Sequence, residues 1–202
     1  PDHAFSGGMV ALLFAIPIIC ALIGIVWGID ILSADKAQDI VAGHVLTGIG
    51  LVCTSLVALV ASVVRQIQNT YSEADRRFWP WLVIVMGTID ILWGLYLLIF
   101  QYSPVTIAPG FVLIGLGIVC YSILSKVLLL ALVWRHPYPL AKRIPLIPVL
   151  TALICLFIAA FLFEAATSNP AYMVPARVMV GLGGICFTLF SIVSILESGT
   201  SS

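Results

Sequence analysis

Charged residues are scarce in this sequence. Only 9% of its 202 residues are Asp, Glu, Lys or Arg, whereas 62% are hydrophobic. An ordinary soluble domain carries about 25% charged residues, so this chain has too little polar surface to cover a water-soluble globule. The cationic and acidic residues balance at 9 each, which implies neither an acidic nor a basic partner and excludes the basic stripe of a nucleic-acid binder.

Signatures of enzyme chemistry are missing as well. The chain has no CxxC pair, no glycine-rich phosphate loop and no paired nucleophile and base, so we expect neither an enzyme nor a bound cofactor or metal. The cysteines are odd in number and all fall inside apolar runs, which favours packing over a disulfide framework. They are Cys20, Cys53, Cys120, Cys155 and Cys186.

Long apolar runs dominate what remains. A membrane-spanning helix needs about 20 mainly apolar residues, and only helices satisfy their own backbone inside lipid at this run length. Six runs qualify: Gly8–Leu32, Ile40–Val64, Trp79–Phe100, Ala108–Trp134, Pro145–Ala166 and Tyr172–Glu197. The sequence therefore predicts an all-α polytopic membrane protein with six transmembrane helices, forming a single transmembrane domain over residues 1–202.

The connections between the runs are short and differ in charge. Those on one side contain six cations, Arg65, Arg76, Arg77, Arg135, Lys142 and Arg143, and those on the other contain only Lys36. Positive residues favour the cytoplasmic side of a membrane, so we expect the Arg-rich connections and both ends of this chain to be cytoplasmic. Aromatic residues mark both interfaces: Trp79, Trp81, Trp134 and Tyr138 on the Arg-rich side, and Tyr102 and Tyr172 on the other.

A pattern recurs three times along the chain. The segments Gly43–Cys53, Gly110–Cys120 and Ala176–Cys186 share a Gly-x-Gly and a Cys at the same offsets. His44, Phe111 and Arg177 occupy matching positions, so the period is 67 and then 66 residues. We interpret each unit as one helical hairpin, with repeats at about 8–70, 79–136 and 145–198. Because a hairpin returns to its starting side, the three tandem repeats share one orientation in the membrane.

Small residues line one face of the second helix in each predicted hairpin. They are seven residues apart in each case: Gly43 and Gly50, Gly110 and Gly117, and Ala176 and Gly183. Such a face lets two backbones approach closely, which is how helices associate in lipid. We favour helix packing here, with a narrow pore or ligand crevice as the alternative.

Two ionisable residues fall deep inside the predicted spans. Asp90 is eleven residues from Trp79, about 16 Å along a helix, and Lys126 is nine residues from Arg135, about 14 Å from the same side. We therefore expect the two side chains to face each other or a shared wet cavity. A proton or ion path and a structural clamp explain the pair equally well, as does a protonated Asp90 with Lys126 extended to the interface.

Two of the connections that carry few cations have an acidic residue before them and a basic residue after them. Asp30 precedes and His44 follows the first, while Glu164 precedes and Arg177 follows the third. We expect ion pairs that close each hairpin at the interface, with a polar site for a proton or an anion as the alternative. His44 is also a candidate pH sensor, because histidine titrates near neutral pH.

Five segments resemble a known family. They are Val41–Leu46, Cys120–Val127, Arg143–Pro148, Val180–Gly183 and Phe187–Glu197. Over its whole length the chain is similar to the uncharacterised bacterial inner-membrane family typified by YhiM. The resemblance implies an inner (plasma) membrane location, a loose link with acid stress, and no established reaction or catalytic residue. It also implies about ten helices in the longer family members, of which this chain would be the carboxy-terminal three repeats.

Three functions remain open from the sequence. The first is a non-enzymatic polytopic inner-membrane protein with an unassigned role in acid or envelope stress. The second is a transporter or channel for protons or small solutes that uses Asp90 and Lys126. The third is a membrane scaffold or subunit, which binds another copy of itself or a partner subunit through its small-residue faces. In each case the lipid bilayer is the principal partner.

Overall fold

The computed structural model describes residues 7–34, 39–134 and 146–200, and the side chains of 11, 12, 14–34, 39–134 and 146–187 within them. Several cations and aromatic residues used to predict the orientation lie outside these ranges. They are Lys36, Arg135, Tyr138, Lys142 and Arg143.

Six long helices make up nearly all of the described chain, which contains no strand. They are α1 (Gly7–Ser33), α2 (Ile40–Ile67), α3 (Glu73–Ile99), α4 (Ile107–Val133), α5 (Leu146–Ala166) and α6 (Met173–Thr200), with the short 3₁₀ helix η2 (Pro170–Tyr172) before α6. All six are long and apolar enough to cross a membrane. The predicted all-α fold with six apolar helices is thus confirmed.

One helix begins well before its predicted start. The apolar run begins at Trp79, but α3 begins at Glu73 because Ser72 caps it. The Ser72 hydroxyl accepts a hydrogen bond from the Asp75 backbone, and the Asp75 carboxylate accepts one from the Ser72 backbone N–H. This capping box holds a charged first turn in the helix, where hydropathy alone gives no signal.

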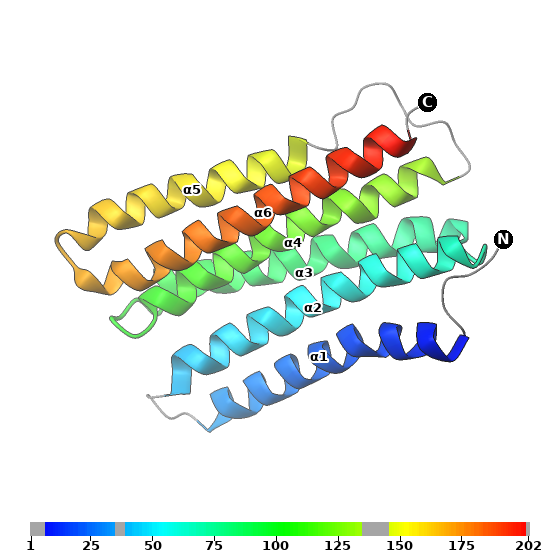
Figure 1. The fold of residues 1–202 in the computed structure, drawn as a ribbon. Helices are drawn as coiled ribbons and strands as arrows, with labels where there is room; N and C mark the ends of the chain where they lie inside the picture. Colours follow the sequence, from blue (N-terminus) through cyan, green and yellow to red (C-terminus); the bar gives the residue numbers. More distant parts are fainter. Residues whose placement is uncertain (1–6, 35–38, 135–145, 201–202) are drawn as a thin grey trace.

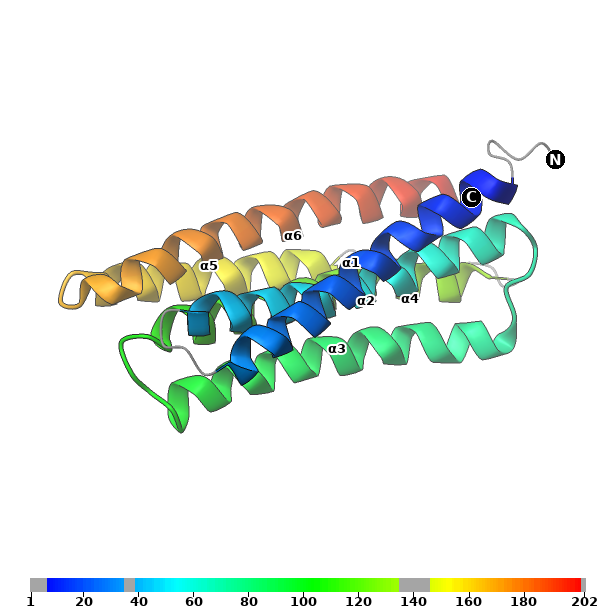
Figure 2. The same cartoon turned by 90° about the horizontal axis from the view of Figure 1, so that it is seen from below.

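The helices lie side by side in one elongated bundle (Figure 1). The α1–α2, α3–α4 and α5–α6 connections gather at one end, which we call the paired-loop end. The α2–α3 connection and the last turns of α4 and α6 lie at the other, which we call the Arg-rich end because Arg65, Arg76 and Arg77 are there. Seen from below, α3 lies along the lower margin and α6 along the upper (Figure 2).

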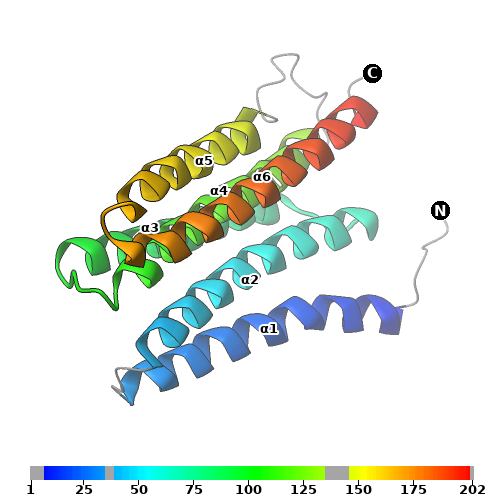
Figure 3. The ribbon, with the colours of Figure 1, turned by 60° about the vertical axis from the view of Figure 1, so that its left-hand side comes forward.

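In the pairs α1/α2 and α3/α4, the second helix is the more buried one. Contacts are densest within the pairs α1 and α2, α3 and α4, and α5 and α6. In addition α2 contacts α3 and α4, and α4 contacts α5 and α6. The side view shows the pairs α1/α2 and α5/α6 on opposite flanks of the bundle (Figure 3). Helix α4 is therefore the central element.

Candidate functional site

Asp90 lies inside the bundle, nine residues before the end of α3 at Ile99, or about 14 Å from that end. Its side chain is fully buried, and neither carboxylate oxygen has a hydrogen-bond partner among the described residues. Buried polar groups are nearly always hydrogen-bonded, and an ionisable group inside a membrane span is costly to bury. Asp90 is therefore the most unusual polar residue in the described part of the chain.

The space around Asp90 is formed by α2 and α4. A Cβ atom built on Gly48 of α2 would lie 3.3 Å from Asp90 Oδ1, so the α2 backbone passes close to the carboxyl group. The same position on α2 faces Leu113 and Leu116 of α4. The carboxyl group is thus held at a three-helix junction.

His44 lies next to this junction on the side of the paired-loop end. It is one helical turn before Gly48, and its ring packs edge-on against Trp93, with ring centroids 5.4 Å apart. Trp93 is three residues after Asp90 on α3. The His44–Trp93 contact and the Gly48–Asp90 contact therefore lie next to each other between α2 and α3. The His44 Nδ1 atom is buried without a hydrogen-bond partner among the described residues.

Buried hydroxyl groups continue along α2 toward the Arg-rich end. Ser55 and Ser62 follow Gly48 at intervals of seven residues and are fully buried. Their hydroxyl groups donate to backbone carbonyls of α2 itself, Ser55 to Leu51 and Ser62 to Ala58. One face of α2 therefore carries a column of polar residues that runs past Asp90. The column comprises His44, Ser55 and Ser62.

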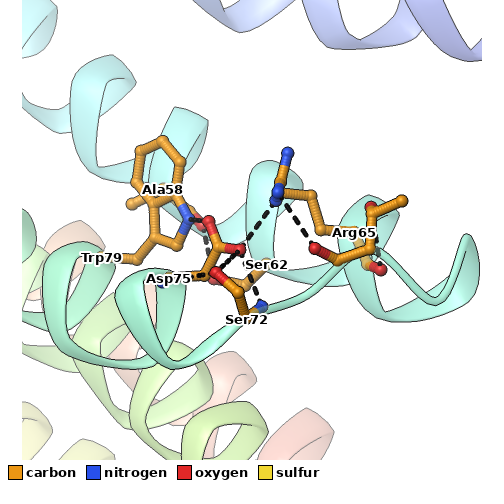
Figure 4. Close-up of polar contacts among 7 residues, drawn as sticks. Ala58, Ser62, Arg65, Ser72, Asp75 and Trp79 are labelled. Atoms are coloured by element: carbon orange, nitrogen blue, oxygen red, sulfur yellow. Dashed lines mark hydrogen bonds and ion pairs between the residues drawn. The ribbon is translucent and has the colours of Figure 1, made fainter.

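An ion-pair cluster lies at the Arg-rich end of this column (Figure 4). Arg65 Nε donates to Asp75 Oδ2 at 2.8 Å, and Trp79 Nε1 donates to Asp75 Oδ1 at 3.0 Å. A second Arg65 nitrogen donates to the Thr70 carbonyl oxygen at 2.9 Å. The cluster joins the end of α2 to the beginning of α3. We did not predict it, although Ser72-x-x-Asp75 before an apolar run is a recognisable capping signal.

Lys126 does not meet Asp90. No described residue forms an ion pair with Lys126, and the Asp90 carboxylate has no hydrogen-bond partner. The two residues differ in depth as well as in direction: Gly117 of α4 packs against Gly87 and Ile91 of α3, so Lys126 lies about eight residues, or about 12 Å, closer to the Arg-rich end than Asp90. Lys126 follows Gly115 by eleven residues, about three turns, so both lie on one face of α4. Gly115 packs against α6, whereas Asp90 faces α2.

The expected interface ion pairs are also not formed. Asp30, Glu164 and Arg177 are exposed, and none of them pairs with a described residue. His44 points toward Trp93 of α3 instead of toward Asp30 of α1. The hydroxyl groups of Tyr102 and Tyr172 do form a contact that links the α3–α4 and α5–α6 connections.

The small-residue positions pack helices together. A Cβ atom on Gly50 would lie 2.7 Å from the backbone nitrogen of Ile25, and one on Gly117 would lie 2.7 Å from the carbonyl oxygen of Gly87. Gly183 likewise faces Leu156 of α5. These glycines therefore permit close contact between the two helices of a consecutive pair.

At Gly43 and Gly110 a Cβ atom would also come too close to a neighbouring helix, where it would meet Leu32 and Leu98 respectively. Ala176 is fully buried in the core. Among the described residues, no three His, Cys, Asp or Glu side chains are grouped as metal ligands would be.

Comparison with known proteins gives one family. Residues 1–201 match the family described as "Protein of unknown function (DUF2776)". The chain is 50% identical over 202 residues to "Inner membrane protein YhiM" of Escherichia coli (strain K12). That alignment covers 100% of this chain and 58% of the relative, so the chain spans less than two thirds of the relative's length. No solved structure matches the chain.

Proposed function

This chain belongs to the DUF2776 family of inner-membrane proteins, and from that premise we propose that it binds protons inside the membrane and moves them across it, alone or with a small solute. The observation that carries the proposal is Asp90, which is fully buried and unpaired in the middle of the bundle. The activity is transport without covalent chemistry.

The energetics of Asp90 favour a proton-binding role. An unpaired carboxylate deep in a membrane protein costs several kcal/mol, and the neutral acid avoids that cost. Releasing the proton would create a buried charge beside Gly48, where the α2 backbone is close to the Asp90 carboxyl group. A charge there has to be relieved by water entry or by helix movement. Proton release at Asp90 is thereby coupled to a change in packing between α2 and α3.

The polar column along α2 supports a path on both sides of Asp90. An imidazole can both accept and donate a proton, and His44 lies on the paired-loop side of Asp90. Ser55 and Ser62 lead toward Arg65 and Asp75 at the Arg-rich end. The column from His44 to Ser62 spans 18 residues of one helix, about 27 Å, which is close to the roughly 30 Å thickness of a hydrocarbon core.

The orientation follows from charge. Arg65, Arg76 and Arg77 lie at the Arg-rich end, and we assign this end to the cytoplasm. Both ends of the chain then lie in the cytoplasm, and His44 is the first titratable group of the column on the outer side. This arrangement suits a protein that responds to external acid or envelope stress.

Three tandem hairpins explain how the bundle is built. Leu32 packs on Gly43 as Leu98 packs on Gly110, and Ile25 packs on Gly50 as Ile91 packs on Gly117. The numbers within each comparison differ by 66 or 67, the period of the sequence pattern. These equivalent contacts support the descent of the hairpins from one repeating unit. A scaffold role is the second candidate function, because the apolar side chains of Ile49 on α2 and Ile185 on α6 are 42% and 49% exposed among the described residues.

Reconstitution tests the transport proposal. In lipid vesicles with an imposed pH gradient, Asp90→Asn should reduce proton flux at least about tenfold while preserving the shape of the side chain. Glu164→Gln is the matched control, because Glu164 is an exposed carboxylate at the end of α5. Its flux should equal that of the unmodified protein. Equal flux in the unmodified protein, Asp90→Asn and empty vesicles would remove the transport function.

A further inference from the structure

We propose that Cys155 of α5 and Cys186 of α6 are a redox site inside the membrane, which a lipid-soluble quinone oxidises to a reversible disulfide. Both cysteines are free and fully buried. The Cys155 thiol donates a hydrogen bond to the Cys186 sulfur, so the two side chains are in contact. The proposal rests on the packing of α5 against α6 and is independent of proton binding at Asp90.

Close packing of α5 against α6 brings the two cysteines together. A Cβ atom on Gly183 of α6 would lie 3.5 Å from the Ala152 carbonyl oxygen, so the two backbones are close at this level. Cys186 is three residues after Gly183 on α6. Cys155 is likewise three residues after Ala152 on α5, so both thiols lie beside this contact. A disulfide requires Cβ atoms about 3.5–4.5 Å apart, which two helices reach only where small residues let them approach closely.

A hydroxyl group of α4 adjoins the two thiols. Ser122 is fully buried, and its hydroxyl oxygen has no nitrogen or oxygen partner among the described residues. It lies beside Cys186, as does the hydroxyl group of Thr151, which already donates to the Pro148 carbonyl oxygen at 2.9 Å. The Ser122 hydrogen is therefore available to the Cys186 sulfur. Thiol oxidation proceeds through the thiolate, and a hydroxyl hydrogen directed at the sulfur supports that form.

The site occupies the place that Asp90 has in the preceding hairpin. Gly117 of α4 packs on α3, where its Cβ atom would lie 2.7 Å from the Gly87 carbonyl oxygen, as Gly183 packs on α5. Gly87 precedes Ala152, the corresponding residue of α5, by 65 residues. Asp90 precedes Cys155 by the same interval, so a thiol replaces the carboxyl group. The same kind of junction thus carries an acid in one hairpin and a thiol pair in the next.

Cys120 is the matching cysteine of the preceding hairpin. It precedes Cys186 by 66 residues, is fully buried, and has the Ser55 hydroxyl group beside its sulfur. Where Cys186 has the thiol of Cys155 for a neighbour, Cys120 has the carboxyl group of Asp90. A carboxyl group cannot form a disulfide. Cys120 therefore shares the burial and the hydroxyl neighbour but should stay a free thiol.

The oxidation is balanced by a quinone. The S–H bonds of Cys155 and Cys186 break, and one S–S bond forms between the two sulfur atoms. Two electrons and two protons pass to the quinone, which becomes the quinol. Cys155 lies nine residues after the start of α5, or about 14 Å along the helix, inside a hydrocarbon core roughly 30 Å thick. An oxidant that dissolves in lipid reaches this depth, and a small thiol reductant reverses the reaction by exchange.

Thiol analysis in lipid vesicles tests the site. The unmodified protein is treated with a fully substituted benzoquinone, which accepts electrons but has no free ring position to which a thiol can add, and is then denatured and alkylated with a maleimide. Peptide mass spectrometry should find Cys155 joined to Cys186, with Cys120 alkylated in the same molecule. Treatment with dithiothreitol before alkylation should return both thiols.

Two variants complete the test. In Cys155→Ser the disulfide should be lost and Cys186 should be alkylated after the same treatment, whereas Cys120→Ser should keep the disulfide yield of the unmodified protein. Alkylation of both Cys155 and Cys186 in the quinone-treated unmodified protein would overturn the proposal. So would a disulfide between Cys186 and any cysteine other than Cys155. Proton flux is measured on the reduced protein, so the failure of either proposal leaves the other standing.

Discussion

Asp90 is unusual because burial removes its carboxyl group from water and the fold supplies no partner. Its place inside a long apolar helix was predictable from the sequence, but its depth relative to Lys126 was not, because the register between α3 and α4 comes from their packing. Its isolation was not predictable. Lys126 lies about eight residues of α4 away from the level of Asp90 and on the face toward α6, and either difference removes the contact.

The interface residues show the same limit at the residue scale. Asp30, Glu164 and Arg177 lie near helix ends as expected, but all three are exposed. An exposed ion pair contributes about 1 kcal/mol or less, which does not determine the direction of a side chain. The pairing of Arg65 with Asp75 is different, because Trp79 and the Ser72 cap also hold the carboxylate in place.

Tyr71 gives a prediction about alkaline pH. Burial raises the pKa of Tyr71 to about 12, and the nearby Asp75 adds to the effect, while Arg76 partly offsets it. Because the folded pKa lies above the ordinary value of about 10, Tyr71 adds stability below about pH 10 that is lost as pH rises through about 12. Tyr71→Phe cannot ionise, so its unfolding midpoint should fall less than that of the unmodified protein across this window. Parallel midpoints, followed by circular dichroism, would contradict the assignment.

Helix packing is the next scale. The sequence predicted six helices because each apolar run is far longer than a strand requires, and the runs are the helices. It misplaced the start of α3, where a polar cap and not hydropathy sets the boundary. The glycines were correctly predicted as packing residues, but which neighbour each one faces depends on helix rotation, and the spacing alone does not specify it.

Two glycine substitutions should differ sharply. In Gly117→Ala, the new methyl group would lie 2.7 Å from the Gly87 carbonyl oxygen, and overpacking of this kind costs about 1–3 kcal/mol. In Gly181→Ala the methyl group meets no described atom, and the better helix propensity of alanine should leave stability equal or slightly higher. Unfolding in mixed micelles measures both. Equal destabilisation by the two substitutions would show that backbone freedom, and not close contact, explains the glycines.

At the scale of the whole molecule, the family and the six apolar helices place the protein in the inner membrane. The orientation is a further prediction from charge. A cysteine in place of Arg77, whose side chain is 80% exposed, should react with a membrane-impermeant thiol reagent only after the cytoplasmic side is opened. A cysteine in place of the exposed Gln101 should react in intact cells stripped of their outer membrane. The reverse labelling pattern would invert the orientation.

The sequence pattern with a period of 66 or 67 residues contains glycines that do lie at close helix contacts. The order in which α2, α4 and α6 pack was not readable, because the faces that meet consist of the same apolar residue types that face lipid. Only the arrangement of α2, α4 and α6 distinguishes Leu113 and Leu116, which fill a neighbour's surface, from Ile49, which is exposed.

Infrared spectroscopy of Asp90 in lipid vesicles is the most direct measurement of the protonation on which the proposed function depends. The spectrum of the unmodified protein minus that of Asp90→Asn at neutral pH should show the carbonyl band of a neutral carboxylic acid, and the band should shift in deuterated water. A difference spectrum that shows only an ionised carboxylate would mean that Asp90 is charged and solvated in the membrane. That result would contradict a proton-binding site held in a dry junction of α2, α3 and α4.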